Sequence, residues 1–162
     1  MKKLALALLM LTLTLPVTAG QSELAEVVEE YLERGVADDL TLMVVHLNDI
    51  TTDALFTAPS KYSLRAQARQ STMFYVQGDA KSDHRVDVDF RLRQGNTVYR
   101  TKAVSLDKFE AGVTIQEGEQ FQGILTLDSS INLRAPFVLT SQDYRLEFEF
   151  SRAAVDRLEP PQ

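Results

Sequence analysis

Strict alternation of apolar and charged residues is the feature that most constrains how this chain can fold. From His84 to Arg93 every second residue is apolar from Val86 onward, and the same alternation returns from Asp143 to Phe150. Side chains on a β-strand point alternately to the two faces of a sheet. Each segment therefore predicts a strand with one buried face and one wet face, which is typical of antiparallel sheets.

Further short strands are predicted by alternation, by β-branched and aromatic residues, or by flanking turn residues. These segments are 41–47, 62–69, 72–77, 97–104, 112–116, 121–127 and 135–140. Gln94-Gly95-Asn96 indicates a turn between two of them, and so a β-hairpin. Gly123 lies in the middle of another, where a bulge or a close approach is expected.

So many short strands without intervening helices favour an all-β fold. Because the strands are short and unequal, we expect an antiparallel Ig-like β-sandwich over residues 40–151 rather than a closed barrel. Pro59 and Pro136 are typical of edges or corners. A C-terminal tail at 152–162 follows, and 152–159 has the character of one or two helical turns.

One amphipathic helix is expected before the sandwich, within residues 20–39. From Ser22 to Arg34, apolar residues recur at helical spacing, and glutamates cover the opposite face. Ser22 suits an N-cap, and Gly35 suits the residue after the helix. The apolar stripe would pack on the sandwich or, alternatively, dock on a partner protein.

The first 19 residues have the pattern of a secretory signal peptide. Lys2 and Lys3 precede the apolar run 4–15, and small residues precede a cleavage point after Ala19. The run is shorter than the roughly 20 residues that a membrane-spanning helix needs. We therefore expect export to the bacterial periplasm or beyond the cell, with no transmembrane segment after signal removal.

The cysteine and histidine content excludes several kinds of catalytic and metal-binding site. The chain has no cysteine, which excludes disulfides, thiolate metal sites and a thiol nucleophile. Its only histidines, His46 and His84, lie beside no nucleophile motif such as G-x-S-x-G. We therefore expect no catalytic triad.

The carboxylates have a structural explanation in the sequence. Asp87, Asp89, Glu147 and Glu149 could form acid–base pairs, but arginines share the same outward strand positions. A cross-strand charge ladder on a solvated sheet explains this set. Calcium is the most reasonable metal, since the loop candidates are aspartates, namely Asp49, Asp53, Asp79 and Asp83. They match no EF-hand pattern, so we predict solvated turn aspartates and no metal or cofactor.

Charge suggests the kind of partner. A formal net charge of −6 disfavours nucleic acid. Arginines nevertheless concentrate in the middle third of the chain, at positions 65, 69, 85, 91, 93 and 100. Outward strand residues of alternating sign would simply keep the sheet soluble. Alternatively, Arg85, Arg91 and Arg93 form a binding face for an acidic protein, an anionic glycan or a lipid head group.

The sequence thus favours a non-enzymatic binding or assembly module of the bacterial envelope, acting on an envelope protein partner. One alternative is a carrier that holds an apolar ligand in a β-enclosed cavity. The residues expected to line that cavity are Phe74, Phe90, Phe121, Leu125, Phe148 and Phe150. A second alternative is an enzyme that uses the carboxylates, with or without calcium.

Overall fold

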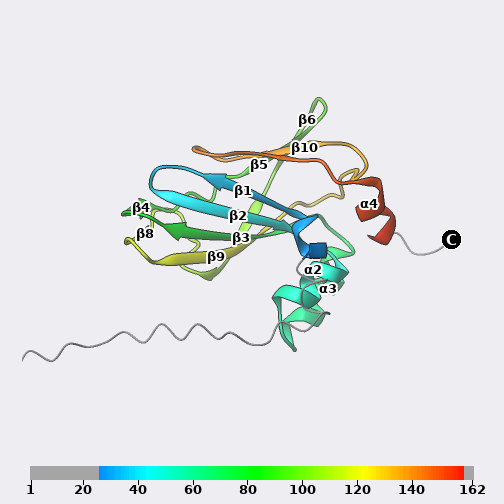
Figure 1. Ribbon diagram of the computed structural model, residues 1–162, viewed down its shortest axis with the longest axis horizontal. Coiled ribbons are helices and arrows are strands. Elements are labelled where there is room, and N and C mark those ends of the chain that lie inside the picture. The colour runs from blue at the N-terminus through cyan, green and yellow to red at the C-terminus, as the bar shows by residue number, and fades with distance from the viewer. Residues whose placement is uncertain (1–25, 159–162) are drawn as a thin grey trace, which may run out of the picture.

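Antiparallel β-sheet is the predominant secondary structure of the described chain (Figure 1). The computed structural model describes residues 26–158. One sheet has five strands in the order β1 (Leu32–Val36), β2 (Leu40–His46), β3 (Met73–Ala80), β9 (Gln120–Thr126) and β7 (Lys102–Asp107). A second sheet has four, in the order β11 (Arg145–Phe148), β10 (Phe137–Thr140), β5 (Arg91–Gln94) and β6 (Thr97–Arg100). The short strands β4 (His84–Arg85) and β8 (Thr114–Ile115) form a separate pair.

The two large sheets share one hydrophobic core. The five-stranded sheet contributes residues such as Leu42, Val44, Phe74, Val76 and Leu125. The four-stranded sheet contributes residues such as Leu92, Phe137, Leu139, Leu146 and Phe148. The alternation predicted around residues 86–92 and 144–148 is therefore confirmed, because Phe90, Leu92, Leu146 and Phe148 all belong to this core.

Two helices cover one end of the opposite face of the five-stranded sheet. They are α2 (Asp49–Leu55) and α3 (Ser60–Ala68), which follow β2 in the chain (Figure 1). Leu55, Leu64 and Ala68 pack there against a second cluster that includes Val45 and Tyr75. This explains why Met73 to Val76 are buried on both faces of β3, as the apolar run at 72–77 predicted.

The predicted hairpin at Gly95 and Asn96 is confirmed. Gln94 pairs with Thr97 across it, and Gly95 has the left-handed φ of 57°. The expected strand at 97–104 is divided at Thr101, because β6 belongs to one sheet and β7 to the other. Likewise, residues 84–93 alternate in burial, but only β4 and β5 within them carry ladder pairs.

The N-terminal helix prediction is wrong over its second half. Residues 26–29 form a helical turn, but β1 begins at Leu32 and pairs along its length with β2. Gly35 ends no helix; a Cβ there would meet the Tyr144 ring at 2.5 Å. Five ladder pairs on a sheet edge outweigh the helical pattern of this segment. The predicted signal peptide at 1–19 lies outside the described residues, as does the start of the predicted helix.

Residues 62–69, predicted as a strand, form most of α3, with Arg69 as its C-cap. The apolar positions Leu64 and Ala68 are four apart, and this spacing fits both a strand and a helix face. Pro59 precedes this helix, while Pro136 directly precedes β10.

The predicted helical turns near the C-terminus are confirmed as α4 (Arg152–Leu158), which buries Ala154 and Val155. Among residues 26–158, no helix is both long enough and apolar enough to cross a membrane.

Candidate functional site

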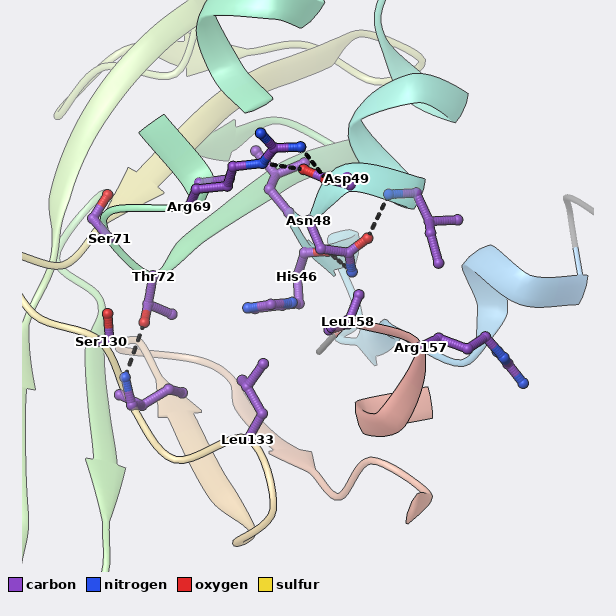
Figure 2. A pocket seen from close by; sticks show the side chains of 14 residues that line it. His46, Asn48, Asp49, Arg69, Ser71, Thr72, Ser130, Leu133, Arg157 and Leu158 are labelled. Carbon is purple, nitrogen blue, oxygen red and sulfur yellow. Dashed lines mark hydrogen bonds and ion pairs between the residues drawn. The ribbon is translucent and has the colours of Figure 1, made fainter. Parts of the chain in front are cut away.

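A cavity of about 630 Å³ lies where β2 ends and β3 begins (Figure 2). We call it the end cavity. Its walls come from the ends of β2 and α3, the start of α2, the chain leading into β3, the loop after β9, and α4. Figure 2 shows His46, Thr72, Ser130, Leu133 and Leu158 around it. Its volume falls in the range of small-molecule sites, roughly 300–1,000 Å³.

Asn48 shapes one wall of the end cavity by capping α2. Its Oδ1 accepts hydrogen bonds from the backbone N–H groups of Ile50 and Thr51, at 2.9 and 3.0 Å. The Thr51 hydroxyl accepts from the Asn48 N–H and donates to the His46 carbonyl at 2.8 Å. This capping box turns the chain from β2 into α2 and holds the backbone of His46 in place.

Contacts with Glu30 and Tyr31, just before β1, hold α4 against the end cavity. The Tyr31 hydroxyl donates to the Ala154 carbonyl at 2.7 Å, and the His46 N–H donates to the Tyr31 carbonyl at 2.9 Å. Arg157 makes a two-pronged ion pair with Glu30, at 2.7 and 3.1 Å. Leu158 is thereby placed in the cavity wall.

Within the described chain, His46 is one of three buried polar residues that line the end cavity, with Asn48 and Thr72. Its ring contacts those of Phe74 and Phe150, with centroids 5.6 and 5.5 Å apart. Its Nδ1 is fully buried, and neither ring nitrogen makes a hydrogen bond with residues 26–158. Burial lowers the pKa of His46 to about 4, so the ring is neutral at neutral pH.

The charged side chains in the cavity wall are paired. Arg69 reaches Asp49 with Nε at 3.1 Å and Nη2 at 2.5 Å, and this hydrogen bonding lowers the pKa of the Asp49 carboxyl. Asp53 pairs with Arg65 on the neighbouring helix. Asp49 and Asp53 were expected in a polar loop, but both lie on α2.

A second candidate site is the outer face of the four-stranded sheet. One cross-strand row there runs Arg145, Thr140, Arg91, Arg100, and the next runs Glu147, Val138, Arg93, Val98. We call Arg91, Arg93, Arg100 and Arg145 the arginine face. All four side chains are exposed.

The charges of the arginine face are only partly compensated. Arg145 pairs with Glu147 at 2.8 Å, and Arg91 meets Asp89 at 3.4 Å. Within the described chain, Arg93 and Arg100 have no ion pair. Arg91 and Arg100 lie directly opposite each other on paired strands, where like charges are destabilising.

The structure separates the three predicted binding arginines. Arg91 and Arg93 share the outer face of β5, but Arg85 lies on β4, in the small two-stranded sheet. The Arg85 guanidinium lies beside Gly112. Arg145 and Arg100 join the face instead, because β6 pairs with β5 on one side, and β10 pairs with β5 on the other side and carries β11 beside it.

The other residues considered in the sequence as catalytic or metal-binding candidates either bond to neighbouring residues or are exposed. His84 Nδ1 lies 2.7 Å from Asp39 Oδ2, and this contact lowers the pKa of Asp39. Asp87 accepts a hydrogen bond from the Gln142 N–H. Glu149 is exposed.

The loop aspartates considered as calcium ligands do not converge on a metal site. Asp79 accepts a hydrogen bond from Gln120, and Asp83 is exposed. In the described chain, no group of three or more His, Cys, Asp or Glu residues is placed to hold a metal ion.

The aromatic residues expected to line a ligand cavity mostly fill the core instead. Phe121 stacks on Phe109 with centroids 5.3 Å apart, and Phe148 stacks on Phe137 at 4.9 Å. Phe74 and Phe90 are also buried in the shared cluster. The end cavity is lined by other residues, which the sequence did not single out apart from His46, Asp49 and Arg69. One signal was present: Asn48 precedes Thr51 by three residues, which is the spacing of a helix cap.

Comparison of the chain with protein-family models, with curated proteins and with solved structures found no match. The end cavity and the arginine face are therefore the features from which a function can be inferred.

Proposed function

We propose that this chain is a non-enzymatic binding or assembly module of the bacterial cell envelope, and that its arginine face docks on an acidic protein surface. The arrangement of Arg145, Arg91 and Arg100 in one cross-strand row carries this proposal. Arg91 and Arg100 are directly opposed, which costs folding free energy, and an anionic surface that met the row would offset this cost.

Charge contrast supports an acidic partner. The chain is acidic overall, with a formal net charge of −6. Two of the four arginines on this face, Arg93 and Arg100, have no ion pair in the described chain, and their charge gives the face a local field of opposite sign that steers an acidic surface to it. The signal-peptide pattern of residues 1–19 is the basis for placing the protein in the periplasm or outside the cell.

We also propose a specific fold class, the Ig-like β-sandwich. Two antiparallel sheets that share one core support an Ig-like sandwich. Such sandwiches commonly present one solvated sheet face, which is where the arginine face lies.

The test compares two triple variants of the purified protein. The face variant is Arg91→Ser/Arg93→Ser/Arg100→Ser. The control variant, Arg85→Ser/Lys102→Ser/Arg152→Ser, removes the same charge from exposed positions outside the arginine face. Proteins captured from an envelope extract are purified, and their dissociation constants are measured at low and high salt.

We expect an acidic envelope protein whose affinity falls about tenfold or more in the face variant and at high salt, and stays unchanged in the control. Equal affinity for both variants would overturn the proposal. Selective binding of phosphatidylglycerol vesicles or heparin, with no acidic protein bound, would overturn it in favour of a lipid or glycan.

The carrier function is a second candidate. Its predicted lining residues mostly fill the core, so only the end cavity favours it.

A further inference from the structure

We infer that the end cavity is a binding site for a small, mostly apolar organic molecule carrying one uncharged hydrogen-bonding group that meets His46. This site is separate from the arginine face, and the inference does not depend on the docking proposed above. It also differs from a cavity inside the sheets, because the end cavity lies beyond the filled aromatic core.

The walls of the end cavity suit an apolar molecule. Leu47, Ile131, Leu133 and Leu158 contribute to its lining from three separate parts of the chain. A cavity of about 630 Å³ is large enough for a drug-sized molecule. Apolar walls with a few polar groups are the usual make-up of such sites.

His46 supplies an unused polar group. Buried polar atoms in folded proteins nearly always have a hydrogen-bond partner, and the buried Nδ1 of His46 has none in the described chain. Nε2, which is not among these buried atoms, has no hydrogen bond to the described residues either. The ring packs against Phe74 and Phe150, but the described chain leaves its hydrogen-bonding capacity unused. A neutral imidazole has one donor and one acceptor, and a ligand hydroxyl can serve either.

The charges of the wall argue against an anionic ligand group. The two cations in the lining are Arg69 and Arg157. Each already makes a two-pronged ion pair, with Asp49 and Glu30 respectively. A carboxylate on the ligand would compete with these pairs and approach a neutral ring, so we expect an alcohol to bind better than the matching acid.

The test uses a neutral fluorescent probe, N-phenyl-1-naphthylamine, which brightens in apolar surroundings. The probe is titrated with the whole protein at pH 7.5 and then displaced by 1-octanol, octanoate or octane. Two variants, Leu133→Trp and Ser130→Trp, fill the cavity from different positions of the loop after β9. Val98→Trp places the same indole on the exposed end of β6, as the matched control.

We expect the wild type and Val98→Trp to bind the probe, and both filling variants to bind it at least tenfold more weakly. Thermal unfolding checks that at least one filling variant is folded. Amide NMR shifts caused by 1-octanol should cluster at residues 46–50, 69–72 and 130–133. Shifts located elsewhere, or probe binding unchanged by both filling variants, would overturn the site.

The role of His46 is tested separately with His46→Leu, which keeps an apolar side chain of useful size. Wild type should prefer 1-octanol over octanoate and octane by about tenfold, and His46→Leu should lose most of that preference while still binding the probe. A preference for octanoate in wild type, or an unchanged preference in the variant, would overturn the assigned ligand chemistry.

Discussion

A neutral histidine inside an aromatic cluster is the most unusual single residue of this protein. His46 lies on the inward face of β2, next to Phe74 and Phe150. Burial disfavours its protonated form, and this holds its pKa at about 4, compared with about 6.5 in an unfolded chain. This one side chain therefore links folding to pH.

The linkage has a defined sign. Between pH 6.5 and 4 the unfolded chain binds a proton at His46 that the folded chain does not, so the free energy of unfolding falls as pH falls through this window. The full effect is on the order of 3 kcal/mol. We expect urea unfolding of the wild type to show this loss, and His46→Phe to show a flatter pH profile.

His46→Phe retains His84 and its contact with Asp39, so the difference between the two profiles isolates His46. Parallel profiles for the two proteins between pH 6.5 and 4 would contradict a buried neutral His46.

At the scale of elements, the link between β2 and α2 depends on a single capping residue. Asn48 serves as the N-cap of α2, and Thr51 completes the box. The same turn carries His46 and forms one wall of the end cavity. Local sequence chemistry and the position of the candidate site are thus connected at this turn.

Removing the Asn48 cap should destabilise the protein, whereas a carboxylate at the same position should still cap α2. We expect Asn48→Ala to lower the free energy of unfolding by about 1 kcal/mol, because two backbone N–H groups lose their acceptor. Asn48→Asp keeps an acceptor and adds a charge that the helix N-terminus favours, so it should retain most of the stability. Urea unfolding of both variants measures the difference; equal losses would argue against the cap.

At the scale of the whole molecule, aromatic side chains fill the core between the two sheets, and one of them packs directly against a glycine backbone. Gly123 on β9 faces Phe109, and a Cβ at Gly123 would meet the Phe109 ring. Phe109 in turn stacks on Phe121 within the shared core. Gly123 was predicted to mark a bulge or a close approach; it lies close to Phe109, and the register of the paired strand β7 shifts directly opposite it, between Ser105 and Asp107.

A double-mutant cycle tests this packing. Gly123→Ala should cost about 2 kcal/mol in the wild type, because the added methyl group clashes with Phe109. In a Phe109→Leu background the same substitution should cost less than half as much, since the smaller side chain can yield. Denaturant unfolding of the four proteins gives the coupling; additive losses would show that the clash lies elsewhere.

Much of the β-structure was predictable because alternation is a local property. Val86, Phe90 and Leu92 are buried, as are Leu146 and Phe148, and the hairpin at Gly95 follows from turn chemistry. The errors fall on segments whose pattern is ambiguous. The spacing of Leu64 and Ala68 fits both a strand face and a helix face. Residues 32–34 end a segment with helical spacing, but in the structure they begin β1 at the edge of the sheet.

Which residues are hidden along each strand follows from short-range pattern, since one strand places its side chains on alternate faces without help from the rest of the chain. Which strands become neighbours does not, because pairing depends on register and on segments far apart in sequence. Arg91 meets Arg100 across a hairpin, yet Arg145 joins their row only through β10. The end cavity likewise needs β2, α2, α3, α4 and a distant loop to converge, and packing of the whole chain alone brings them together.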